Sequence, residues 1–194
     1  MKDQLIINFL KVRLLGHKIN INNSEEIIKK CISLGYNDML SRGKYYLTNE
    51  LNNQIKDNFY NILKENNYTF SKKLFNETIL LFGNSEKIYN YKNHTYVTRV
   101  GLTQKLINMT FKYLYVFQDE IKLNIDFSKW HCPIDSIIFE ELEKKTNIPL
   151  TKKYIWSTIN ETDYNYLQDI IKDLIKDEEL YNELGNLLFD FKYW

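Results

Sequence analysis

Breaks in helical periodicity are rare in this chain, and their scarcity constrains the fold more than any other feature. The 194 residues include only two prolines and six glycines, the residue types that most often interrupt or end a helix. Between them, apolar residues recur three or four positions apart, as they do along one face of a helix. Hydrophobic residues make up 44% of the chain, enough for a substantial core. We therefore predict a single all-α domain over residues 1–194.

Helix caps and stops divide this pattern into predicted helices. Ser24, Thr48, Ser71 and Thr103 have side chains that cap helix N-termini, and Gly35 is of the type that ends helices. The predicted helices occupy residues 24–35, 48–67, 71–83, 103–118, 133–147, 162–176 and 178–191. Residues 84–98 have no clear period, so we predict an irregular connection there.

Several classes of protein are disfavoured by composition. No apolar run approaches the roughly 20 residues of a membrane span, and residues 1–4 lack the order of a signal peptide, so we expect a cytoplasmic protein that does not enter a membrane. Cys31 and Cys132 are too few for a disulfide framework. His131 beside Cys132 cannot by itself close a tetrahedral metal site. We expect neither a metal nor an organic cofactor.

Charge is segregated along the chain. Residues 159–194 contain nine acidic and three basic residues, so the preceding part has an excess of seven basic ones. A basic body is suited to contact with phosphates, although solvated helical proteins often show the same asymmetry.

Lys105 and Asp135 are separated by thirty positions, and each stands near the start of a predicted helix. A sixteen-residue helix carries the chain about 24 Å from the lysine, and a fifteen-residue loop reaching up to about 50 Å can return it. A helix N-terminus, nearby Arg99 and partial burial would each lower the lysine pKa toward the value that an amine nucleophile needs. The carboxylate can stabilise positive charge that develops on a sugar as its base departs. We also expect Gly101 to form a turn whose N–H groups bind a phosphate.

Arg99-Val-Gly-Leu-Thr-Gln-Lys105, an aromatic-rich helix and Trp130-His-Cys-Pro-Ile-Asp135 follow in that order. This order resembles the helix-hairpin-helix superfamily of DNA glycosylases, and its long spacing is most similar to the archaeal 8-oxoguanine branch. The resemblance covers about forty residues, roughly a fifth of the chain. One departure is that the usual pair of glycines around an apolar residue appears as Val100-Gly101-Leu102-Thr103. The family fold implies two lobes around a cleft, with residues 1–98 as the first lobe, 99–145 as the hairpin and catalytic segment, and 146–194 as the C-terminal helices.

The resemblance also implies roles for individual residues. Lys105 would displace the damaged base and form a Schiff base that permits strand cleavage, and Asp135 would be the catalytic carboxylate. The implied partner is double-stranded DNA with a damaged base, bound by a monomer. Extrusion of that base requires a pocket. The residues assigned to base recognition are Trp130, His131, Trp156 and Gln104, with Tyr154 nearby, and those assigned to DNA contact are Arg99, Gly101 and Thr103.

Each of these residues also has an ordinary structural explanation. Asp135 is explained as a helix cap, and a buried structural tryptophan is the commoner outcome for Trp156. The alternative function is therefore a non-enzymatic helical module that binds nucleic acid or a protein, in which Lys105 only clamps a phosphate.

Overall fold

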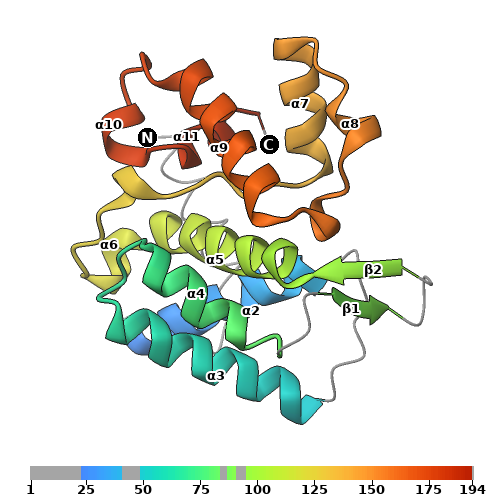
Figure 1. The fold of residues 1–194 in the computed structure, drawn as a ribbon. Helices are drawn as coiled ribbons and strands as arrows, with labels where there is room; N and C mark the ends of the chain where they lie inside the picture. Colours follow the sequence, from blue (N-terminus) through green and yellow to red (C-terminus); the bar gives the residue numbers. More distant parts are fainter. Residues whose placement is uncertain (1–22, 41–48, 84–86, 91–94, 194) are drawn as a thin grey trace.

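The structure is a computed structural model that describes residues 23–40, 49–83, 87–90 and 95–193, and it is predominantly helical (Figure 1). Its helices are α2 (Ser24–Leu40), α3 (Asn49–Glu65), α4 (Lys72–Leu80), α5 (Arg99–Val116), α6 (Gln118–Ile121), α7 (Ser136–Thr146), α8 (Leu150–Lys153), α9 (Glu161–Ile175), α10 (Tyr181–Leu184) and α11 (Leu187–Tyr193). Strands β1 (Lys87–Asn90) and β2 (Thr95–Thr98) and the 3-10 turns η1 (Phe127–Lys129) and η2 (Trp156–Thr158) complete these elements.

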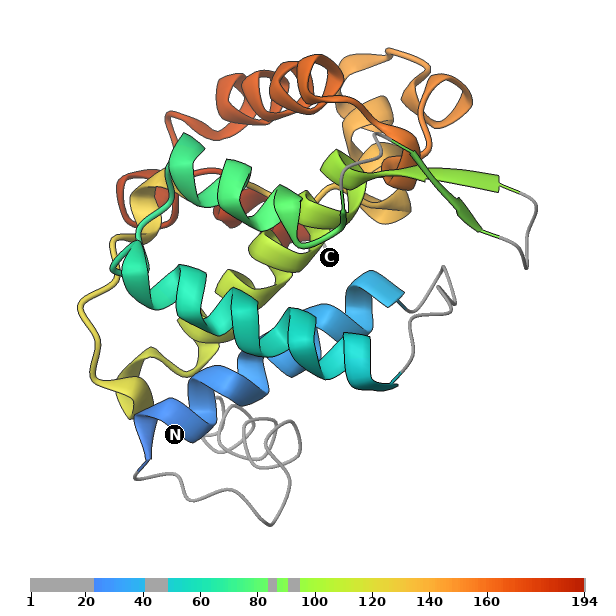
Figure 2. The same cartoon turned by 60° about the horizontal axis from the view of Figure 1, so that its bottom comes forward.

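Helix α5 lies in the middle of the molecule. Helices α2, α3 and α4 lie on one side of it, and the helices from α7 to α11 lie on the other (Figures 1 and 2). Thirteen of its eighteen residues are buried, and these include lysine, glutamine, asparagine and threonine as well as apolar residues. A helix enclosed on all sides must find partners for its polar side chains, because an unpaired buried polar group is costly.

Two glycines allow close packing against α5. A Cβ on Gly35 would lie 2.6 Å from Oγ1 of Thr110, and one on Gly101 would lie 2.8 Å from the backbone of Ser157. The prediction that Gly35 ends its helix is wrong, since α2 continues through it to Leu40. A side chain at either position would therefore push α2 or η2 away from α5.

The start of α5 also differs from the prediction. The helix begins at Arg99, and its cap is Thr98, whose Oγ1 accepts a hydrogen bond from the N–H of Gly101. Gly101 therefore lies in the first helical turn, and Thr103 is a buried helical residue rather than the cap. The chain enters α5 directly from β2, which pairs antiparallel with β1 where an irregular connection was predicted. The expected glycine turn before the helix is not present.

Other helix ends agree more closely with the sequence. Ser71 caps α4 through a hydrogen bond from the N–H of Leu74, and Asn147, with a φ of 58°, ends α7 as predicted.

The predicted helix over 178–191 is instead divided into α10 and α11 at Gly185, where φ is +53° and an added Cβ would overlap the backbone of Ser128. Thr48 lies outside the described residues. None of the described helices is long and apolar enough to cross a membrane.

Candidate functional site

Residues 130–135 form an extended segment that runs antiparallel to α5. Gln104 pairs with both backbone groups of Ile134: its Nε2 donates to the carbonyl at 2.9 Å, and its Oε1 accepts from the N–H at 3.0 Å. One helical turn later, Nδ2 of Asn108 donates to the carbonyl of Cys132. Four helical residues rise about 6 Å and two extended residues about 6.6 Å. One amide side chain per turn of α5 therefore matches every second residue of the segment.

Helix α9 holds the same segment from another direction. Oε1 of Gln168 accepts from the N–H of Cys132 at 3.0 Å, and Nε2 of Gln168 donates to the Cys132 carbonyl at 2.8 Å. Nδ2 of Asn186 in turn donates to the backbone carbonyl and to Oε1 of Gln168. Side-chain amides thus replace the neighbouring strands that an extended segment would otherwise need for its buried backbone groups.

This register brings Lys105 and Asp135 together. Lys105 follows Gln104, Asp135 follows Ile134, and the Nζ and Oδ2 atoms of the pair lie 2.8 Å apart. Both side chains are largely buried, with 7% and 12% of their surfaces exposed. The predicted proximity is confirmed, whereas the catalytic roles of the two residues stay predictions.

Asp135 uses its two oxygens for different purposes. Oδ2 contacts the lysine, and Oδ1 accepts from the N–H groups of Ile137 and Ile138 at the start of α7. Burial alone would raise the pKa of Asp135, but attraction to Lys105 and the three hydrogen bonds outweigh it and hold the pKa below its ordinary value. The carboxylate is therefore charged at neutral pH and fixed in position. Asp135 is the N-cap of α7, so the helix starts at Ser136 and not in the turn at Pro133.

The surroundings of Lys105 differ from those predicted. It is the seventh residue of α5, well inside the helix, so the helix N-terminus does not adjoin its amine. The guanidinium of Arg99 donates to the carbonyl of Gly83 at 2.7 Å. The ring centre of Trp156 lies 6.0 Å from the Lys105 amine, a distance at which a cation and an aromatic face attract one another.

The other predicted contact residues are divided among separate places. Thr103 is fully buried, and Gln104 uses both ends of its amide on Ile134. Trp130 is buried against Phe111, and Tyr154 stacks on Phe139. Only Trp156, among the residues assigned to base recognition, has its side chain beside the lysine amine.

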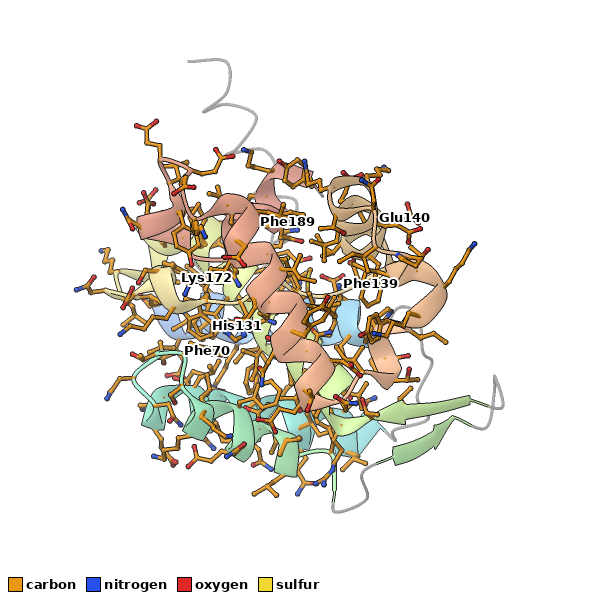
Figure 3. All side chains as sticks on the ribbon, turned by 45° about the horizontal axis from the view of Figure 1, so that its top comes forward. Phe70, His131, Phe139, Glu140, Lys172 and Phe189 are labelled. Atoms are coloured by element: carbon orange, nitrogen blue, oxygen red, sulfur yellow. The ribbon has the colours of Figure 1, made fainter. Side chains whose placement is uncertain are left out.

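His131 lines two cavities formed by described residues, and neither cavity is lined by Lys105 or Asp135. The larger, of about 380 Å³, lies beside η1, α9 and α10, and the smaller, of about 150 Å³, lies between α4 and α9. His131 and Phe70 lie together beside α9 (Figure 3). The predicted pocket residues Trp130 and His131 therefore line a hollow, but not one that contains the lysine.

A second buried ion pair, Lys112–Asp190, was missed in the sequence. Its Nζ and Oδ2 atoms lie 2.6 Å apart, and the Asp190 side chain is only 1% exposed. Burial raises the pKa of Asp190 more than Lys112 lowers it. The available signal was the recurrence of polar residues at every fourth position of α5, at Gln104, Asn108 and Lys112.

No family model matches this chain, and comparison with curated proteins and with solved structures gave no significant match. Among the residues that the structure describes, no group of three or more histidine, cysteine, aspartate or glutamate side chains is placed to hold a metal ion.

Proposed function

We propose that the protein is a DNA glycosylase with apurinic-site lyase activity that removes a modified base such as 8-oxoguanine. The observation that carries this proposal is the 2.8 Å contact between Nζ of Lys105 and Oδ2 of Asp135, two residues thirty positions apart. A buried amine and a fixed carboxylate are the two groups that this chemistry requires. In this proposal the helices on the two sides of α5 are the two lobes of a helix-hairpin-helix glycosylase.

The reaction begins with a proton transfer. The Lys105 ammonium must lose a proton to solvent before attack, while Asp135, whose Oδ2 contacts the amine, stays ionised. The neutral amine then bonds to the anomeric carbon, and the bond to the base breaks with its electron pair leaving on the base, which is protonated by solvent. The aspartate charge stabilises the positive sugar as that bond lengthens. Opening of the sugar ring, with a solvent proton taken up by the ring oxygen, gives a Schiff base. The C2′ proton is then lost to solvent and the 3′-phosphate leaves by β-elimination.

For a substrate to reach the Lys105 amine, η2, which places Trp156 beside that amine, must move. Trp156 in η2 faces the amine, and η2 packs on α5 at Gly101. The adjoining chain exposes Lys152, Lys153 and the apolar side chain of Ile155, which is 64% exposed. Basic side chains supply phosphate contacts, so this segment is the part of the molecule that we expect duplex DNA to meet and displace.

Borohydride trapping tests this function. With a duplex that contains an abasic site or 8-oxoguanine, the wild-type protein should form a covalent adduct that is stable to denaturing electrophoresis. Lys105→Met keeps most of the aliphatic stem, removes the amine and should abolish the adduct. Lys112→Met is the matched control, because it removes the other buried lysine of α5, and it should still give the adduct. An adduct that persists in Lys105→Met, or none from the wild-type protein with either duplex, overturns the proposal.

A binding module without catalysis is the second candidate, and the burial of Lys105 favours it. An amine that is 7% exposed and paired with a carboxylate has a sufficient structural role in holding residues 130–135 against α5. This candidate predicts salt-dependent binding of undamaged duplex, unchanged by Lys105→Met and without any adduct. The trapping experiment therefore separates the two functions.

A further inference from the structure

The two cavities adjoin one another and differ in chemistry. His131 and Asn165 line both of them. The larger has a volume within the range of small-molecule sites, and its walls include the charged side chains of Lys129, Lys172 and Asp169. The smaller is lined by the rings of Phe70, Phe75, Tyr164 and His131, and also by the ion-paired side chains of Lys72 and Glu161. A charged compartment and an aromatic compartment thus share one wall.

The shared histidine is held in one orientation. Nδ2 of Asn108 donates to the hydroxyl of Tyr164 at 2.9 Å, and that hydroxyl forms a hydrogen bond with Nδ1 of His131 at 2.8 Å. Burial lowers the pKa of His131 to about 4, so the ring is neutral at physiological pH. The Phe70 ring packs against the imidazole with 4.3 Å between ring centres.

We propose that these adjoining cavities bind a ribonucleoside 5′-monophosphate. The base stacks on the half-buried ring of Phe70, because Phe75 and Tyr164 are buried and stack on one another, and every nucleobase has a face that suits an aromatic side chain. The phosphate lies between Lys129 and Lys172, whose ammonium groups bind phosphate oxygens as point charges. Asp169 accepts hydrogen bonds from the sugar hydroxyls, the role that an acidic side chain has in many nucleotide sites.

The charges around the larger cavity fit such a ligand. The walls have two lysines and one aspartate, which leaves one net positive charge for a phosphate. Lys129 also contacts Asp126 at 3.5 Å, but both side chains are about half exposed or more. An exposed ion pair of this kind is weak, so a phosphate can compete for the ammonium group.

This site is separate from the lysine of the proposed glycosylase. His131 precedes Asp135 by four residues of extended chain, about 13 Å, and neither Lys105 nor Asp135 lines either cavity. The nucleotide proposal therefore does not depend on the proposed catalytic function.

Calorimetric titration with adenosine 5′-monophosphate tests the site. We expect saturable binding, weakened by about tenfold or more in both Lys172→Ala and Phe70→Ala, since each removes one main interaction. Lys176→Ala is the matched control, because Lys176 is an exposed lysine at the end of the same helix and does not line the cavity. Its affinity should equal that of the wild-type protein.

Two ligand fragments test the division into compartments. Adenosine lacks the phosphate and inorganic phosphate lacks the ring, so each should bind at least about tenfold more weakly than the intact nucleotide. The proposal is overturned by the absence of binding at millimolar nucleotide, by unchanged affinity in either variant, or by inorganic phosphate binding as tightly as the nucleotide. Borohydride trapping should be unaffected by Lys172→Ala, so failure of this site and failure of the glycosylase are distinguishable.

Discussion

Two buried lysine–aspartate pairs lie along α5, and they differ in what surrounds the carboxylate. The lysines, Lys105 and Lys112, are seven residues apart, or about two helical turns, and each lies within 2.8 Å of its partner. Asp135 caps α7 and accepts two backbone hydrogen bonds in addition to the lysine contact. Asp190 lies within α11 and has no such donors among the described residues. The pKa is lowered for Asp135 and raised for Asp190.

The two aspartates show separately what a lysine contact and what backbone hydrogen bonds contribute to the pKa of a buried carboxylate. Both carboxylates lose hydration on burial, and both gain a lysine within contact distance. Attraction to the lysine does not by itself offset the loss of water, as Asp190 shows, because desolvation of two charges is expensive. Backbone N–H groups at a helix N-terminus add the remaining stabilisation for Asp135. An isolated buried pair is thus a weaker contributor to stability than one built into a helix cap.

Removal of the carboxylates should have the largest effect. Asp135→Ala loses the α7 cap and leaves the Lys105 amine buried, so we expect the free energy of unfolding to fall by about 3–5 kcal/mol. Asp190→Ala should cost about 1–3 kcal/mol, because this carboxylate is less well satisfied in the native state. Urea denaturation at pH 7 measures both. Equal losses would contradict the distinction, and Asp135→Asn, which keeps a capping oxygen, is the fallback if Asp135→Ala does not fold.

The next largest loss in the free energy of unfolding should follow from breaking the pairing between Gln104 of α5 and the backbone of Ile134. Gln104→Leu leaves the N–H and carbonyl of Ile134 without their partner, and we expect a loss of about 2–4 kcal/mol from two unsatisfied backbone groups. Because the first pair depends on this register, the variant should also lose borohydride trapping. Gln54→Leu is the control: Gln54 is an exposed glutamine of α3, so its replacement should change the free energy of unfolding by less than about 0.5 kcal/mol. Normal trapping by Gln104→Leu would show that the Lys105–Asp135 contact forms without the amide.

The sequence predicted the first pair and not the second for a physical reason. Asp135 comes two residues after Pro133 and directly before the start of α7, and a helix cap can be recognised from its neighbouring residues alone. Asp190 meets Lys112 only when α11 packs on α5, and the residues next to it, Phe189 and Phe191, form no local pattern that predicts this contact. Similarly, the chain length between Lys105 and Asp135 allowed them to meet, but the reason that they do is the spacing of amides on α5.

The fold shows the same division between local and tertiary information. The caps at Ser71 and Asn147 and the apolar faces of the long helices were predicted, because they depend on neighbouring residues. The functions of Gly35 and Gly101 were not, since both depend on backbone from distant segments that a Cβ would strike. The β-hairpin was missed because its two strands of four residues each are too short to show a clear alternation.

Replacing both members of a pair by apolar side chains should change the free energy of unfolding less than removing one carboxylate does, and for the second pair it should raise it. Lys112→Met with Asp190→Leu exchanges the second pair for hydrophobic side chains, and we expect a change between zero and about 2 kcal/mol of added stability. Lys105→Met with Asp135→Leu also removes the helix cap, which should subtract about 1 kcal/mol or more. Thermal and urea denaturation of the two double variants measure the difference. A stabilised first pair together with a destabilised second one would reverse our ranking.

The smallest expected effect is on pH dependence, where the two aspartates should act in opposite directions. Asp135 has a lowered pKa, so its contribution is present above the ordinary value of 3.8 and is lost as pH falls through the lower folded value. Asp190 has a raised pKa, so its contribution is present below 3.8 and is lost as pH rises through the folded value. As pH rises above about 4, ionisation of Asp190 should lower the free energy of unfolding, and Asp190→Asn should remove this decline. As pH rises toward about 4, ionisation of Asp135 should raise the free energy of unfolding, and Asp135→Asn should remove this increase. Urea midpoints from pH 2.5 to 7 in each variant measure these slopes. If both variants changed the slope in the same direction, the difference in hydrogen bonding between the two carboxylates would not control their ionisation.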